Sequence, residues 1–136
     1  MTTADSLARL QAVEDRIAIQ DVVSAVTLWS DLDEPAKVLA CFTDDAVIDY
    51  SSLSGPAAAN TPVAEHRARM ATFLPGFDKR QHLVTNFAIT VDGDTAVSRA
   101  HSFAFHALGD EIWEARGSDT HRLRRTPQGW KIHYQK

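Results

Sequence analysis

The sequence predicts an α+β domain in which three helices come before a long antiparallel sheet. Apolar residues recur at helical spacing from Leu7 to about Leu32. From Phe77 onward the chain forms long alternating stretches separated by turn-forming residues. Helices and one strand followed by such a meander are typical of an α+β domain. Strands this long should twist and curl, which gives a concave face that the helices can cover.

Length and composition limit the class of protein. The chain has 136 residues, of which 44% are hydrophobic and 24% charged, so we expect one soluble globular domain over residues 1–136. No apolar run approaches the roughly 18 residues of a membrane span, and the first residues do not resemble a secretory signal. The net charge of −4 disfavours nucleic acid as a partner. We therefore expect a cytoplasmic protein with neither membrane nor nucleic-acid partners.

The long N-terminal helix changes its apolar face along its length. Its first half carries Leu10, Val13 and Ile17 in one sector. In the second half that sector holds Gln20, Ser24, Thr27 and Asp31, whereas Ile19, Val22, Val26 and Trp29 lie opposite. Asp31 falls in the last turn, where the negative end of the helix dipole costs roughly 0.3–1 kcal/mol. This mild misfit makes Asp31 a candidate functional residue.

The segment between this helix and the sheet predicts two more helices and one strand. The expected ranges are 35–42 for a short helix, 46–52 for the strand and 62–74 for the third helix. Asp33 is the expected N-cap of the short helix and Thr61 that of the third, whose first position is Pro62. Thr43-Asp44-Asp45 predicts a turn. Cys41, the only cysteine, lies among apolar residues and is expected to be a buried, inert thiol.

The rest of the chain predicts four strands. Their ranges are about 79–91, 95–108, 111–125 and 129–134, and their turns are Asp92-Gly93-Asp94, Gly109-Asp110 and Pro127-Gln128-Gly129. One basic cluster, Arg122, Arg124 and Arg125, flanks the last turn, and we expect it to be a solvated strand end.

Period-two alternation sorts the strand residues by face. One face of the strand 95–108 carries mostly small residues, which leave room for a ligand: Ser98, Ala100, Ser102, Ala104 and His106. The same alternation groups His82, Val84 and Asn86 on the preceding strand, and Trp113, Ala115, Gly117, Asp119 and His121 on the following one. These sets are the candidates for a pocket wall.

The available side chains favour acid–base chemistry over other kinds of site. His101 and His106 lie five residues apart on one strand and so point to opposite faces, and no residue pair has zinc-site spacing. The sequence has no nucleophile elbow and no phosphate-binding glycine loop. We therefore expect neither metal nor cofactor, which leaves histidines and carboxylates acting as acids and bases.

Several short motifs resemble the SnoaL-like group of the nuclear-transport-factor-like (cystatin-like α+β) superfamily. They are Phe42-Thr43-Asp44-Asp45-Ala46-Val47, Ile48-Asp49-Tyr50, Gln81-His82, Gly93-Asp94-Thr95-Ala96 and Gly129-Trp130-Lys131-Ile132, in this order. The resemblance covers essentially the whole chain. It implies a cone-shaped α+β barrel in which the three helices pack in the concave face of a strongly curved antiparallel or mixed sheet. It also implies a homodimer or homotrimer, but the fold alone does not name a reaction.

Within this group the chain is most similar to scytalone-dehydratase-type small-molecule dehydratases. That resemblance implies catalytic roles for Asp31, Tyr50, His82 and, with a one-residue adjustment in the hairpin, His106. Asp119 takes the place of a substrate-contacting asparagine, and Ser30 that of a tyrosine. The aromatic residues Trp29, Phe105 and Trp113 are further candidates for substrate binding, although a core or subunit interface would explain them equally well.

The implied activity is that of a cofactor-independent lyase acting on a small hydrophobic β-hydroxy carbonyl compound. In this hypothesis His82, oriented by Asp31, removes the proton next to the carbonyl. Tyr50 stabilises the enolate, and His106 or Asp119 assists the departing hydroxyl. The alternatives are an isomerase or polyketide-cyclase-type enzyme using the same enolate, or a non-catalytic small-molecule-binding module.

Overall fold

The computed structural model describes all residues from 1 to 136. Its helices are α1 (Thr3–Asp31), α2 (Pro35–Ala40), α3 (Ser51–Ser54) and α4 (Val63–Phe73), with short 3-10 turns at Pro56–Ala58 and Leu74–Gly76. Its strands are β1 (Phe42–Ile48), β2 (Thr61–Pro62), β3 (Lys79–Asp92), β4 (Thr95–Leu108), β5 (Glu111–Thr126) and β6 (Gly129–Gln135). The three predicted helices correspond to α1, α2 and α4.

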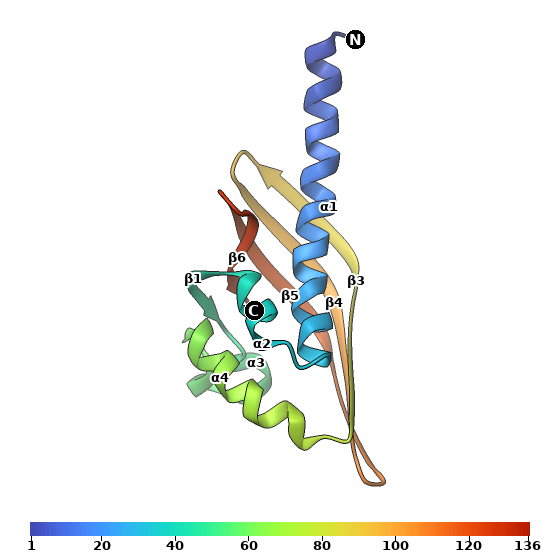
Figure 1. The fold of residues 1–136 in the computed structure, drawn as a ribbon, viewed down its shortest axis with the longest axis vertical. Coiled ribbons are helices and arrows are strands. Elements are labelled where there is room, and N and C mark those ends of the chain that lie inside the picture. Colours follow the sequence, from blue (N-terminus) through green and yellow to red (C-terminus); the bar gives the residue numbers. More distant parts are fainter.

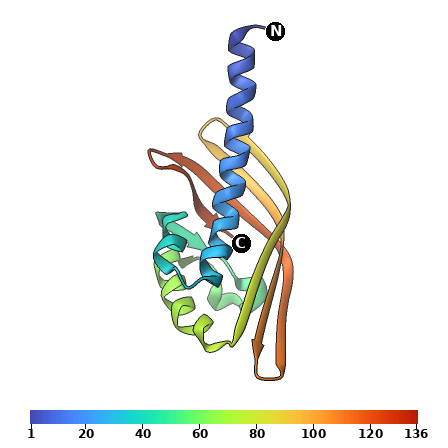
Figure 2. The ribbon, with the colours of Figure 1, turned by 45° about the vertical axis from the view of Figure 1, so that its right-hand side comes forward.

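The six strands form one mixed sheet in the order β2-β1-β6-β5-β4-β3. Only β1 and β6 pair in parallel, and every other neighbouring pair is antiparallel. The sheet is curved, and the C-terminal half of α1 lies across its concave side while α4 lies near β1 (Figures 1 and 2). This arrangement confirms the predicted α+β fold with helices packed on a curved sheet.

The core lies between the second half of α1 and the sheet. Ile19, Val23 and Val26 recur at spacings of four and three, so they share one helix face and pack with Leu123 and Ile132. The first half of α1 extends beyond the sheet instead (Figure 1). Its apolar residues Leu7, Leu10, Val13 and Ile17 are all exposed. No helix of the molecule combines the length and the apolar character needed to cross a membrane.

A partly buried ion pair joins α1 to the β5–β6 hairpin. The carboxylate of Asp15 accepts two hydrogen bonds from Arg125, at 2.8 and 2.9 Å, and a third from Nε1 of Trp130 at 3.0 Å. Arg124 forms an ion pair with Asp45 across the sheet. Arg125 is exposed, as predicted for a solvated strand end, but the sequence did not predict that a distant carboxylate on α1 binds it.

Three local predictions before the sheet are wrong. Thr43-Asp44-Asp45 belongs to β1 rather than to a turn, and the β1–β6 register shifts between Phe42 and Val47 to accommodate these residues. Asp33 does not cap α2: it has a positive φ of 55° and forms an ion pair with Arg80, while Glu34 occupies the N-cap position. Thr61–Pro62 pairs with β1 as β2, so α4 begins one residue later than predicted.

A β-bulge in β3 corrects the predicted face of Asn86. The register of β3 against β4 shifts between Thr85 and Ala88, and Asn86 adopts a left-handed conformation with φ of 58°. Asn86 is exposed as a result, and Phe87 packs against the core. Because the extra residue reverses the alternation, Asn86 does not share a face with His82 and Val84.

Candidate active site

The end of α1 and the beginning of β3 meet at Asp31 and His82. Nδ1 of His82 lies 2.6 Å from Oδ1 of Asp31, and the backbone N–H of His82 donates to Oδ2 at 2.8 Å. An ionised carboxylate only accepts hydrogen bonds, so Nδ1 carries the proton and Nε2 is left free to accept one. Both side chains keep some access to solvent, with 21% of His82 and 15% of Asp31 exposed.

Arg80, two residues before His82, explains how the helix end tolerates an acid. Its Nη2 donates to the carbonyl of Ser30 at 3.5 Å, and its Nη1 donates to the carbonyl of Leu74 at 3.1 Å. The last turn of α1 contains no basic residue of its own. A cation supplied by β3 therefore binds a carbonyl of the last turn of α1, at the negative end of the helix dipole, and also pairs with Asp33. The same strand thus holds the helix end and supplies the imidazole that Asp31 binds.

His106 lies beside this pair in a cluster of rings. Its ring centroid is 5.1 Å from that of His82 in an edge-on arrangement, 4.7 Å from Phe77 and 4.9 Å from Trp113. His106 is buried, and its Nδ1 has no hydrogen-bond partner. Burial, together with the nearby charge of His82, lowers the pKa of His106, so the ring is neutral near pH 7.

Asp119 and Tyr50 both remain protonated more readily than free side chains. Asp119 accepts a hydrogen bond from Oγ of Ser102 at 3.1 Å, but burial raises its pKa against the opposing effects of Ser102 and His82. The hydroxyl oxygen of Tyr50 accepts a hydrogen bond from Nε2 of Gln135 at 2.9 Å. Burial raises the pKa of Tyr50 as well, so its hydroxyl stays neutral and can donate to a ligand.

The three predicted aromatic ligand contacts have different positions. Trp113 touches the ring of His106, and Trp29 lines a crevice of about 280 Å³ between the end of α1, α2 and α4. Phe105 pairs with Gln81 and Glu114, and strand alternation places it on the face of β4 opposite to His106. Strand alternation turns the ring of Phe105 away from the other site residues, so its contact with substrate stays a prediction that this position does not favour.

Two buried residues with basic side chains lie on the inner side of the fold: His121, which the sequence placed on the expected pocket wall, and Arg67, which sequence reasoning missed. His121 lies in a cross-strand row with Ser98 and Gln135, and burial lowers its pKa to about 4 with a contribution from the charge of Arg67. Arg67 projects from α4 and is only 8% exposed. The sequence did contain a signal for Arg67, because this residue interrupts a helical apolar stripe formed by Val63, Met70 and Leu74.

No group of three or more His, Cys, Asp or Glu side chains is arranged to hold a metal ion.

Comparison with known proteins identifies the family. Residues 11–136 match the family model for the SnoaL-like domain. The chain belongs to the SnoaL-like domain family. An uncharacterized relative, Rv2910c of Mycobacterium tuberculosis, is 30% identical over 136 residues, which cover 93% of this chain and 86% of the relative.

Solved structures agree with this assignment. A protein of Novosphingobium aromaticivorans provisionally named an aromatic ring hydroxylase is 32% identical, with a TM-score of 0.80 over 90% of this chain and 87% of that one. An NTF2-like protein with a cystatin-like fold from the same organism has a TM-score of 0.84 at 22% identity, covering 98% and 87% of the two chains. A provisionally named scytalone dehydratase, also from that organism, has a TM-score of 0.74 at 18% identity over 98% and 85%. At such low identities the last two structures show that the SnoaL-like chain has an NTF2-like, cystatin-like fold.

Proposed function

We propose that this SnoaL-like protein is a cofactor-independent lyase that removes water from a small hydrophobic β-hydroxy carbonyl compound. The observation that carries the proposal is the Asp31–His82 pair, whose two hydrogen bonds fix the imidazole with Nε2 available as a base. A scytalone dehydratase is among the provisional names of proteins with this fold, which is consistent with elimination chemistry.

The first step of the proposed reaction is proton abstraction. Nε2 of His82 takes a proton from the carbon next to the carbonyl, and the electrons of the broken C–H bond form an enolate. The Asp31 carboxylate stabilises the resulting imidazolium through Nδ1. The neutral hydroxyl of Tyr50 donates a hydrogen bond to the enolate oxygen, directly or through one water.

In the second step the enolate expels the β-hydroxyl group. The carbonyl re-forms, a carbon–carbon double bond appears and the C–O bond breaks, with the departing oxygen protonated to water. The raised pKa of Asp119 favours it as the acid that gives up the proton, while the neutral ring of His106 can assist by donating a hydrogen bond to the departing oxygen. The proton held on His82 then restores the acid through solvent. Trp29 and Trp113 are proposed to contact the apolar part of the substrate.

A β-hydroxy ketone gives a direct test. The hydrate of benzylideneacetone gains near-ultraviolet absorbance on dehydration, so turnover can be followed continuously. We expect Asp31→Asn and His82→Ala to lower kcat/KM by about a hundredfold or more while the circular dichroism spectrum stays unchanged. The matched controls are Asp21→Asn on the same helix and His101→Ala on the outer face of β4, both exposed in the structure. Full activity in both site variants would exclude this mechanism.

The alternatives share the first step and can be separated in the same samples. Isomerisation or aldol cyclisation also begins with an enolate, so either reaction would exchange α-protons for deuterium in heavy water without net loss of water. A non-catalytic binding module would show neither exchange nor dehydration. If proton exchange depends on His82 but no dehydration occurs, the result favours isomerisation or cyclisation over dehydration.

A further inference from the structure

Arg67 is a buried cation without a counter-ion. Only 8% of the residue is exposed, and both Nε and Nη2 are buried with no hydrogen-bond partner. No Asp or Glu side chain forms a salt bridge with it, although the exposed neighbour Arg69 binds Glu65 at 3.5 Å. Desolvating an arginine without an acceptor costs several kcal/mol, so such a side chain normally has a partner.

The groups that surround Arg67 do not neutralise it. Its guanidinium lies 5.2 Å from the ring centroid of Phe42, and this cation–π contact brings no negative charge and no hydrogen-bond acceptor for Nε or Nη2. Its charge acts on Cys41, Tyr50 and His121, all of which are neutral at pH 7 because burial raises the pKa of the first two and lowers that of His121. The acid that also influences Tyr50 is Asp119, which is hydrogen-bonded to Ser102 instead.

The two unsatisfied donors have the geometry of an anion-binding fork. Nε–H and one N–H of Nη2 lie on the same edge of the planar guanidinium and point in parallel. This edge binds the two oxygens of a carboxylate with two parallel hydrogen bonds. A single water can accept only part of this donor set and brings no negative charge.

We propose that Arg67 binds a carboxylate group of the substrate through Nε and Nη2. The proposal rests on the proposed function for the identity of the site and adds that its substrate is an anion with an apolar body. Arg67 lines a crevice of about 280 Å³ together with the acids Asp33 and Glu34, but these two acids already form ion pairs with Arg80 and Lys37. The charge of Arg67 also acts on Tyr50, the residue proposed to bind the enolate oxygen, so a carboxylate held on α4 would lie near that end of the substrate.

A matched pair of probes tests the proposal. The compound 3-benzoylpropionate carries an apolar ring, a ketone and a carboxylate, and its primary amide differs only in the charged group. Their dissociation constants are measured by isothermal titration with the full chain and with Arg67→Met, Arg67→Lys and Arg69→Met. Arg67→Met preserves length and apolar packing, and Arg69→Met removes an exposed charge from the same helix.

We expect the native chain and Arg69→Met to bind the carboxylate at least about tenfold more tightly than the amide. Arg67→Met should abolish this preference, and Arg67→Lys should keep only part of it because ammonium lacks the fork. If Arg67→Met fails to fold, Arg67→Lys still decides the outcome, since an unchanged preference in that variant would argue against the fork. An equal affinity of the native chain for both probes would overturn the proposal.

The result can be distinguished from failure of the proposed reaction. Asp31→Asn should retain the preference for the carboxylate even though its dehydration activity is lost. If the chain prefers the carboxylate but dehydrates no substrate, the proposed Arg67 site is supported and the proposed lyase activity is rejected. Dehydration that needs Asp31 and His82 but shows no carboxylate preference would reject the Arg67 site alone.

Discussion

Both carboxylate oxygens of Asp31 form hydrogen bonds with His82. Oδ1 binds Nδ1 of the ring, and Oδ2 accepts from the backbone N–H. An amide at this position can accept at only one of its two heavy atoms. Asp31→Asn therefore either loses the backbone contact or presents a donor to Nδ1, which favours the wrong tautomer of His82. The backbone contact also means that the sheet fixes the position of the carboxylate before any substrate binds.

Two other histidines make folding sensitive to pH. Burial, with the charge of Arg67, lowers the pKa of both His66 and His121 to about 4, against about 6.5 in an unfolded chain. Between these values the unfolded state binds more protons, so the free energy of unfolding falls as the pH drops from 6.5 to 4. We expect a loss on the order of 2 kcal/mol for each histidine, visible as lower urea midpoints at pH 5 than at pH 7.5.

The control for this prediction is the exposed His101. His121→Gln should reduce the difference between the two urea midpoints, whereas His101→Gln should leave it unchanged. Asp119 changes stability in the opposite direction, because its pKa is raised in the folded state. At pH values above the ordinary aspartate pKa, the folded state binds more protons at this residue than the unfolded state does, so protonation of Asp119 stabilises the fold. Equal midpoints at the two pH values in the native chain would contradict the assignment of neutral buried histidines.

At the scale of elements, α1 is attached to the sheet at two points along its length. Arg80 and His82 of β3 hold its C-terminal turn, and Arg125 and Trp130 hold Asp15 near its middle. The apolar residues between these points form the core. The geometry of the proposed site thus depends on a helix whose position is fixed by polar contacts at both ends of its buried stretch.

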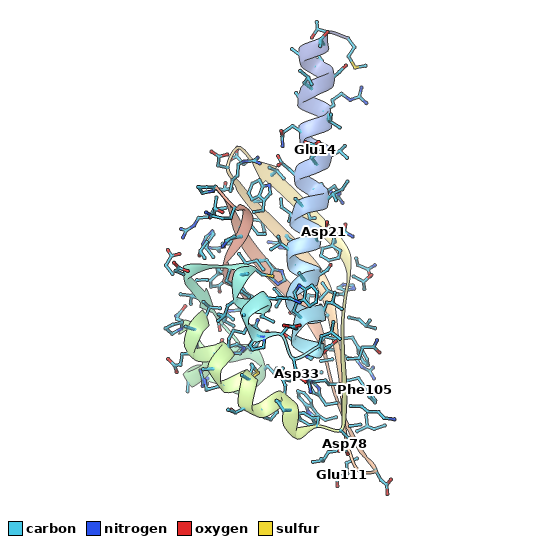
Figure 3. All side chains as sticks on the ribbon, in the orientation of Figure 1. Glu14, Asp21, Asp33, Asp78, Phe105 and Glu111 are labelled. Carbon is cyan, nitrogen blue, oxygen red and sulfur yellow. The ribbon has the colours of Figure 1, made fainter.

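Removing the second attachment should destabilise the domain. Asp15→Ala leaves the buried indole N–H of Trp130 without an acceptor and the Arg125 guanidinium without one of its carboxylates. We expect a loss of about 2–4 kcal/mol in the free energy of unfolding, measured by urea denaturation. Asp21→Ala, on the exposed side of the same helix (Figure 3), should change it by less than about 0.5 kcal/mol. Similar values for the two variants would show that the Asp15 network adds little.

For the whole molecule, the outstanding feature is the part of α1 that extends past the sheet (Figures 1 and 2). Its residues Leu10, Val13 and Ile17 are exposed on one helix face. The family resemblance implies a homodimer or homotrimer, and such an assembly would cover this face. We therefore expect the protein to be a homo-oligomer in solution.

Light scattering after size exclusion measures this directly. Val13→Glu should shift the native oligomer to a monomer, since it places a charge in the middle of the apolar face. Glu14→Gln, at the neighbouring and more polar position, is the control and should leave the mass unchanged. All residues of the proposed site come from one chain, so the probe-binding preference of Arg67 should survive in Val13→Glu. A native protein that is monomeric at all concentrations would contradict this expectation.

The sequence by itself determined the family, the α+β class, the long strands and the face on which Ser98, Ala100, Ser102 and His106 lie. These depend on local periodicity and on short motifs, which a single chain displays directly. It also pointed to Asp31 and His82 as a pair through the family resemblance. The sequence did not predict the bulge at Asn86 or the short pairing of Thr61–Pro62 with β1, because register is a property of two strands together.

Only the tertiary structure decided which charges are partnered. It brought Arg125 to Asp15 and Arg80 to the end of α1, and it left Arg67 buried without an acceptor. Periodicity can place a charged side chain on an apolar face, as it does for Arg67, but it does not name the partner, which lies tens of residues away in the chain. The role of such a side chain is set by desolvation and by what packing places within hydrogen-bond distance, and neither quantity exists until the helices close over the sheet.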